Sequence, residues 1–392
     1  MNNTYHDINQ KILSLQQALT SNKNKVSFLL GAGCPLSIRV TEDGNNKPLI
    51  PDIKELTSIV LANISDDKSK QLVTEIPHKT NTSPTIEDIL SKIRLMIEIA
   101  GTGQINGLTK NELQIFEKNI CDQITNAVNK ELPSNQTPYH DLATWINGIS
   151  RLNAVEIFTP NYDLLMESAL ESKFIPYFDG FVGSKRAFFD LHSMENENLP
   201  ARWVRLWKLH GSINWGMDKN GNIFRGNIDT ILSAEDKQMI YPSHLKYSQS
   251  RRMPYLAMLD RLTNFLTKGQ TVLITSGYSF VDQHLNEAIV QKLSANPNAL
   301  CFGMLYEDIE QYPEAISCAN MVSNLCLFAK DSGYFAGEKL KWGIENTIEN
   351  KYEYLVSSDN DIIICHIGDF SKLCKFLIKQ TGNLFTEAQN AS

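Results

Sequence analysis

The hydrophobic positions along the chain follow two periods, one typical of buried strands and one typical of amphipathic helices. Short apolar or alternating runs predict strands at residues 26–30, 154–158, 204–209, 272–275, 299–305, 325–329 and 362–366. Apolar residues spaced three or four apart predict helices at residues 8–20, 53–62, 139–149, 164–170, 254–268, 282–293 and 370–378. This alternation of strands and helices predicts an α/β fold with a doubly wound, Rossmann-like parallel sheet.

A helical block interrupts the alternation after the first predicted strand. Residues 84–131 carry two stretches of helical period, and Thr109 with Glu112 forms a capping box at the start of the second. We therefore expect an inserted helical subdomain over residues 64–150 that leans over the edge of the sheet.

A second insert is expected over residues 172–250, where the pattern is less regular. It includes one predicted strand and a hairpin whose turn carries Asn220 and Gly221, a pair typical of tight hairpin turns. With both inserts, the chain is expected to form a single domain over residues 1–392.

The composition excludes several classes of protein. The 392 residues are 42% hydrophobic, which is enough for a sizeable core. A net charge of −7 argues against charge-driven binding of nucleic acid or of an anionic membrane by the chain as a whole. No apolar run reaches the about 18 residues of a membrane span. The first residues also lack the basic and apolar regions of a secretory signal. We expect a cytoplasmic protein.

The seven cysteines are scattered, and no Cys-x-x-Cys pair occurs. The nearest spacing is that of Cys318 and Cys326. Because such pairs are the usual ligands of a structural zinc ion, we expect no metal.

Three polar segments, at residues 31–33, 161–163 and 209–211, each follow a predicted strand. In doubly wound folds, ligands bind outside the carboxyl ends of the strands, near the point where the strand order reverses. Together the segments predict a nucleotide pocket with a polar reaction centre.

The first segment is Gly31-Ala32-Gly33. Glycines at this place would let main-chain N–H groups approach an anionic pyrophosphate that a Cβ atom would block. Taken alone, the same three residues are equally compatible with an ordinary tight turn.

The other two segments carry the candidate reacting groups. Asn161 and Asp163 flank Tyr162, so their side chains can point to one side. Asp163 could equally cap the following helix, whereas Asn161 lies outside that cap. His210 precedes Gly211, which lets a ligand come close, and an imidazole can act as a general base near neutral pH. A histidine at a strand end can also be purely structural.

The order Gly-Ala-Gly, Asn-x-Asp and His-Gly resembles the NAD-binding core of the sirtuin family. Residues 50–54, 276–280 and 367–370 resemble further motifs of that family, so the likeness spans roughly residues 25–380. The motif variants found here are Asn-Tyr-Asp, His-Gly-Ser-Ile-Asn-Trp and Gly-Tyr-Ser-Phe. They are most similar to the motifs of the bacterial sirtuin-like NAD-consuming enzymes of antiphage defence.

The resemblance implies a role for each matching residue. Asn161 would contact the nicotinamide-side ribose and place the attacking water, and His210 would act as the general base. Gly277 and Ser279 would receive the adenosine-side ribose or phosphate, and Asp369 or its backbone would meet the adenine edge. The remaining residues of the implied NAD-binding set are Gly31, Ala32, Gly33, Asp52 and Asp163.

Two positions depart from the family pattern. Pro160 replaces the usual glutamine before the asparagine, which changes the expected loop shape. Lys54 replaces the arginine of the Pro-Asp loop, keeping the charge but losing the planar, bidentate fork.

The resemblance implies hydrolysis of the nicotinamide–ribose bond of NAD to nicotinamide and ADP-ribose, by a latent effector of antiphage defence. Two alternatives stay open: NAD-dependent protein deacylation, and a subunit that senses NAD or ADP-ribose without turnover. Sirtuin deacylases carry a zinc ribbon built from Cys-x-x-Cys pairs, so their absence here disfavours the first alternative. Control is expected from homo-oligomerisation or from a separate protein, for which the resemblance suggests a HerA-type hexameric motor ATPase.

Overall fold

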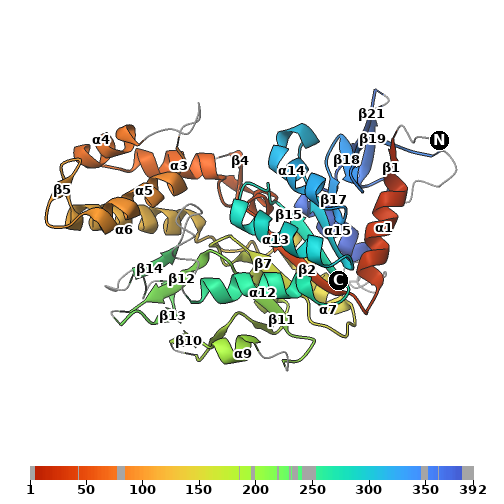
Figure 1. The fold of residues 1–392 in the computed structure, drawn as a ribbon, viewed down its shortest axis with the longest axis horizontal. Helices are drawn as coiled ribbons and strands as arrows, with labels where there is room; N and C mark the ends of the chain where they lie inside the picture. The colour runs from red at the N-terminus through yellow and green to blue at the C-terminus, as the bar shows by residue number, and fades with distance from the viewer. Residues whose placement is uncertain are drawn as a thin grey trace.

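The fold is a central sheet with helices on both faces, extended on one side by a bundle of helices and a small second sheet (Figure 1). The computed structural model describes residues 5–42, 44–76, 84–184, 186–195, 199–218, 220–228, 231, 237–240, 253–345, 352–360 and 362–381.

The central sheet has ten strands, and every neighbouring pair from β17 to β8 is parallel. Beyond β17, strand β18 runs antiparallel and β19 returns to pair with β1. In spatial order the strands are β1 (His6–Asp7), β19 (Glu338–Gly343), β18 (Ser332–Phe335), β17 (Leu325–Phe328), β16 (Ala299–Met304), β15 (Thr271–Ser276), β2 (Lys25–Leu30), β7 (Glu156–Thr159), β11 (Val204–Lys208) and β8 (Tyr177–Phe178). The expected α/β fold with a largely parallel sheet is confirmed.

The strand order reverses beside β2. The chain leaves β2 through β7 and β11 on one side, then returns to β15 on the other. The carboxyl ends of β2 and β15 therefore meet at the switch point, where doubly wound folds bind ligands.

Both faces of the sheet are buried, as the continuous apolar strands predict. In β2, Phe28 and Leu30 pack with one layer of helices and Leu29 packs with the other. The first layer comprises α1 (Ile8–Thr20), α7 (Pro138–Gly148), α8 (Leu165–Ser172) and α15 (Phe370–Lys379). The second comprises α12 (Tyr255–Thr267), α13 (Gln283–Ala295) and α14 (Pro313–Met321).

The helical extension contains α3 (Ile53–Ala62), α4 (Asp67–Glu75), α5 (Ile86–Ile99) and α6 (Lys110–Val128), with the short hairpin of β5 (Gln104–Ile105) and β6 (Leu108–Thr109) between the last two (Figure 1). The predicted capping box of Thr109 and Glu112 is present at the start of α6. Helix α7, by contrast, packs against α8 and α15 on the sheet. Helices α3, α5 and α6 contact one another instead. The expected bounds of the insert, 64–150, stay a prediction.

The second insert is more regular than its sequence suggests. Besides β8 and the helix α9 (Leu191–Glu195), it forms an antiparallel sheet in the order β14 (Lys237–Ile240), β12 (Gly211–Met217), β13 (Ile223–Arg225), β10 (Ala187–Phe189) and β9 (Phe181–Val182). The expected hairpin joins β12 to β13. Residues 241–250 of the expected insert lie outside the described residues.

One predicted strand lies elsewhere than expected. Strand β21 (Ile362–Cys365) pairs only with β20 (Val356–Asp359) in a separate hairpin, instead of joining the parallel sheet. The remaining short elements are α2 (Gly33–Leu36), β3 (Arg39–Glu42), β4 (Asn45–Pro48) and the 3-10 turn Ile309–Gln311. Among the described residues, no helix has the length and apolar character needed to cross a membrane.

Candidate functional site

A cavity of about 240 Å³ lies at the carboxyl ends of β2, β7, β11 and β15. The predicted site residues that line it are Gly31, Ala32, Asn161, Asp163, His210, Gly277 and Ser279. The helical extension contributes Ile53, Leu56, Glu87 and Val128 to the same wall. Segments far apart in the sequence thus converge on one cavity at the topological switch point.

The glycines of two loops interlock at the floor of this cavity. A Cβ atom on Gly31 would lie 2.3 Å from the carbonyl oxygen of Gly277, and one on Gly277 would lie 2.4 Å from the amide nitrogen of Cys34. Gly277 also has a φ of +61°, in the left-handed region that favours glycine. The backbones of the two loops can approach this closely only without side chains.

This packing changes the explanation of the Gly-Ala-Gly segment. The N–H of Gly31 donates to the carbonyl of Ser276, and the N–H of Gly33 donates to that of Gly277, both at 2.9 Å. These two amides are therefore engaged inside the protein, whereas the sequence suggested that they would face a pyrophosphate. The glycines hold β2 and β15 together at their carboxyl ends.

Asn161 is fixed from two directions. Its backbone N–H donates to Thr159 Oγ1 at 3.1 Å, and its side-chain Nδ2 donates to the carbonyl of Gly31 at 3.1 Å. Thr159 Oγ1 in turn donates to the carbonyl of Leu30. The carboxamide is thereby anchored to the end of β2 while it lines the cavity.

His210 lies beside a carboxylate that the sequence analysis did not single out. Its Nε2 is 3.2 Å from Oδ2 of Asp282, and the two side chains are only 11% and 10% exposed. The other oxygen of Asp282, Oδ1, accepts the amides of His284 and Leu285 at the start of α13. Its position before a predicted helix marks Asp282 as a cap, but only the fold brings it to His210.

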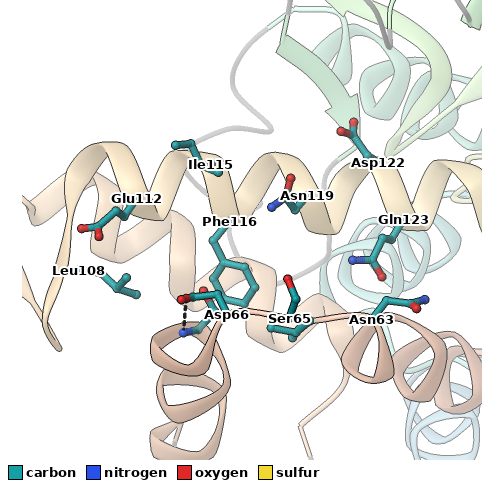
Figure 2. A pocket seen from close by; sticks show the side chains of 12 residues that line it. Asn63, Ser65, Asp66, Leu108, Glu112, Ile115, Phe116, Asn119, Asp122 and Gln123 are labelled. Atoms are coloured by element: carbon teal, nitrogen blue, oxygen red, sulfur yellow. Dashed lines mark hydrogen bonds between the residues drawn. The ribbon is translucent and has the colours of Figure 1, made fainter.

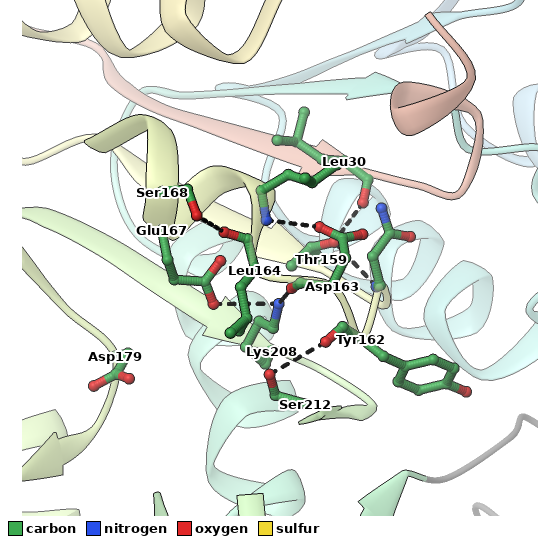
Figure 3. Close-up of polar contacts among 12 residues, drawn as sticks. Leu30, Thr159, Tyr162, Asp163, Leu164, Glu167, Ser168, Asp179, Lys208 and Ser212 are labelled. Atoms are coloured by element: carbon green, nitrogen blue, oxygen red, sulfur yellow. Dashed lines mark hydrogen bonds and ion pairs between the residues drawn. The ribbon is translucent and has the colours of Figure 1, made fainter. Parts of the chain in front are cut away.

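Asp163 belongs to a buried charged cluster beneath the cavity (Figure 3). Its Oδ1 accepts the amide of Leu165 at 3.0 Å, as a residue capping the start of α8 would. The ammonium of Lys208 donates to the backbone carbonyl of Asp163 and lies 3.3 Å from Oε1 of Glu167. Burial raises the pKa of both carboxyl groups, and the nearby Lys208 partly opposes the shift.

Tyr162 connects the same loop to the helical extension. Its hydroxyl lies 3.3 Å from Oε1 of Glu87 on α5 and donates to it. Burial, and after it the charge of Glu87, raises the pKa of this phenol well above its usual value. One wall of the cavity is therefore hydrogen-bonded to the loop that carries Asn161.

Three residues of the expected NAD-binding set do not line the cavity. Gly33 packs behind it against Gly277. Asp52 caps α3 through the amide of Glu55, and Asp369 caps α15 through the amide of Ser371. These aspartates have ordinary capping roles that explain their place before a helix.

Lys54, on α3, is exposed and is also absent from the lining of the cavity. The position of Lys54 does not support a contact between its side chain and a ligand bound beside Asn161 and His210.

A larger cavity of about 390 Å³ lies on the helical extension, away from these motifs (Figure 2). Its carboxylates have structural partners. Asp66 accepts the amide of Ser69, and Glu112 completes the capping box of α6 and pairs with Lys68. Its lining includes side-chain amides such as Asn119 but no histidine, so size alone does not mark it as a reaction centre. Over the described part of the chain, no cluster of three or more His, Cys, Asp or Glu side chains could hold a metal ion.

Comparison with known proteins points in the same direction as this geometry. Residues 155–316 match the model of a SIR2-like domain. This match covers less than half of the chain but includes Asn161, His210 and Asp282. No curated protein matches.

Solved structures of Sir2 proteins are similar at 12% identity. One from work on the mechanism and regulation of Sir2 enzymes aligns over 82% of this chain and 92% of its own, with a TM-score of 0.37. A mutant Sir2 homologue in complex with ADP-ribose aligns over 96% and 98%, with a TM-score of 0.40. A Sir2 homologue in complex with NAD aligns over 80% and 89%, with a TM-score of 0.35.

Proposed function

We propose that this protein hydrolyses NAD at the nicotinamide–ribose bond, releasing nicotinamide and ADP-ribose. The supporting observation is that the Asn161 carboxamide and the His210 imidazole line one cavity at the switch point of the sheet. The SIR2-like segment includes both residues.

The proposed chemistry needs few groups. Cleavage passes through an oxocarbenium-like ribosyl centre, as other glycoside cleavages do. Nicotinamide leaves as a neutral molecule because its ring is cationic in NAD, so no strong acid is required. Asn161 would hold the ribose and the attacking water in a near-attack geometry. His210 would accept the proton of that water.

Asp282 would act as a positioning residue for His210. A carboxylate beside Nε2 favours the tautomer that carries its proton there, and Nδ1 would then be the nitrogen that accepts a proton. It also stabilises the imidazolium that forms during the step. Because Oδ1 is held by the start of α13, the carboxylate is fixed before substrate binds.

The direct test is product analysis on NAD with purified full-length protein. We expect nicotinamide and ADP-ribose in equal amounts, and a loss of at least about 100-fold in kcat for Asn161→Ala and His210→Ala. His192→Ala, at an exposed residue of α9, is the matched control and should behave as wild type. Release of nicotinamide at the wild-type rate by both site variants would refute the proposal.

Two further arms separate the alternatives. An acetylated peptide is added, and formation of acyl-ADP-ribose would indicate deacylation in place of hydrolysis. NAD that binds in a fixed ratio to protein and is recovered intact would indicate a sensing subunit without turnover.

We also propose that the activity is latent and serves antiphage defence by depleting NAD. Unregulated NAD hydrolysis would harm the host, so control would come from homo-oligomerisation or from a HerA-type motor ATPase. This proposal is based on the sequences of the Asn-Tyr-Asp and His-Gly-Ser motifs. Assays with and without that ATPase, combined with mass measurement of the assembly, test it.

A further inference from the structure

The two loops that carry the proposed catalytic side chains are joined by hydrogen bonds, which we call the loop seam. Figure 3 shows the contacts that Lys208 and Ser212 make in it. Its members are Leu209 N–H to Thr159 O at 2.8 Å, Ile213 N–H to Tyr162 O at 3.1 Å, Ser212 Oγ to Tyr162 O at 3.3 Å, and Lys208 Nζ to Asp163 O. Asn161 and His210 lie between the ends of this seam. Their separation is therefore set by it.

Lys208 is the charged member of the seam and is only 2% exposed. A buried ammonium requires partners, because removing it from water is costly unless hydrogen bonds and an opposite charge replace the solvent. Here the carbonyl of Asp163 and the carboxylate of Glu167 supply them. Lys208 stands two residues before His210, and Asp163 stands two residues after Asn161.

The mechanism proposed above does not use this buried lysine. Its ammonium connects β11, from which the His210 loop departs, to the start of α8, into which the Asn161 loop leads. An ammonium has three N–H donors, so Lys208 can bind a carbonyl and a carboxylate together. The contact with the carbonyl fixes the backbone that immediately follows the Asn161 carboxamide.

We propose that Lys208 is a positioning residue that holds the Asn161 loop against the His210 loop at the separation needed for reaction, with Glu167 as its counterion. This inference rests on the proposed function for its effect on turnover. Its effect on the backbone of the two loops does not depend on that function.

The experiment must separate positioning from simple stabilisation, because Lys208→Met alone leaves Glu167 as an unpaired buried charge. The double variant Lys208→Met/Glu167→Gln removes both charges of the pair and should recover most of the Tm lost by the single variant. The matched control is Lys118→Met/Asp122→Asn, an exposed ion pair on α6.

Two readouts are taken on the double variant. Hydrogen–deuterium exchange of the peptide covering residues 209–213 should be about 10-fold faster than in wild type, because the seam opens more often. The kcat for nicotinamide release should fall about 100-fold with little change in KM, because a misplacement of about 1 Å reduces rate more than binding. The control variant Lys118→Met/Asp122→Asn should change neither the exchange rate nor kcat.

The outcomes are distinct. If the double variant regains kcat and wild-type exchange along with Tm, Lys208 only stabilises the fold and the inference is overturned. Unchanged exchange overturns it as well, whatever the activity. If wild-type protein releases no nicotinamide, the proposed function fails, and the exchange measurement still decides whether Lys208 holds the two loops together.

Discussion

Nε2 of His210 lies 3.2 Å from Oδ2 of Asp282, although the two residues come from loops after different strands. The same carboxylate caps α13 through its other oxygen. Asparagine is an equally good helix cap, so Asp282→Asn removes the charge beside the imidazole while it preserves the cap.

For Asp282→Asn we expect kcat to fall about 10²-fold, within the range that general acid–base groups contribute. The pH–rate profile should also change, because the variant removes the negative charge that lies 3.2 Å from the imidazole. Initial rates of nicotinamide release between pH 5 and 9 measure both effects. Asp66→Asn, at the cap of α4, is the matched control and should leave rate and profile unchanged. Identical profiles for the two variants would contradict the assigned role of Asp282.

The interlocked glycines give a prediction on stability. A methyl group on Gly31 would meet the backbone of Gly277 at 2.3 Å, and backbone cannot move aside as a flexible side chain can. Gly31→Ala should lower the free energy of unfolding by about 1–3 kcal/mol, measured by urea denaturation. Gly101→Ala, where a Cβ meets nothing within 4 Å, should change it by less than about 0.5 kcal/mol. Wild-type stability with lost NAD affinity would instead favour direct contact of Gly31 with the nucleotide.

The buried carboxyl of Asp163 gives a prediction on pH. Burial raises its pKa in the folded protein, so the folded state binds this proton more tightly than the unfolded chain does. The resulting stability is present below the unfolded pKa and is lost as pH rises through the folded pKa. Wild type should therefore lose stability relative to Asp163→Asn as the pH rises above the unfolded pKa of about 4, measured by urea denaturation over a series of pH values.

Asp66 is the control of opposite sign. Hydrogen bonds from Ser69 lower the pKa of this carboxyl, so its contribution is present at higher pH and is lost as pH falls through the folded pKa. Wild type should lose stability relative to Asp66→Asn on acidification. Equal slopes for the two variants would show that Asp163 does not titrate as its burial requires.

The helical extension depends on one buried ion pair. Arg94 Nε lies 2.6 Å from Glu117 Oε1, with side chains only 4% and 8% exposed. Glu117→Gln removes the carboxylate charge that lies 2.6 Å from this buried guanidinium and should lower the free energy of unfolding by about 3–5 kcal/mol. Lys339→Met breaks an exposed pair with Glu310 and should cost no more than about 1 kcal/mol. Chemical denaturation compares the two, and equal small effects would mean that water reaches Arg94.

Much of the fold follows from local pattern. The strand ending at Leu30, helix α3 and the capping box at Thr109 lie where periodicity and cap chemistry predict them. These features depend on residues within one or two turns of each other, which is why a single sequence reveals them. Strand β21 shows the limit: its apolar residues predict a strand but cannot say which sheet it joins.

The candidate site also has features that the sequence predicts and features that it does not. By itself, the sequence determined that an amide, an imidazole and several glycines follow buried strands, because the order of residues along a strand fixes what lies at its end. Only the tertiary structure decided that Asp282 meets His210, that Lys208 reaches Asp163, and that Gly31 packs on Gly277. These contacts join segments that are far apart in the chain, and they exist because β15 returns beside β2. Strand order is a property of the whole packed sheet, and no local pattern encodes it.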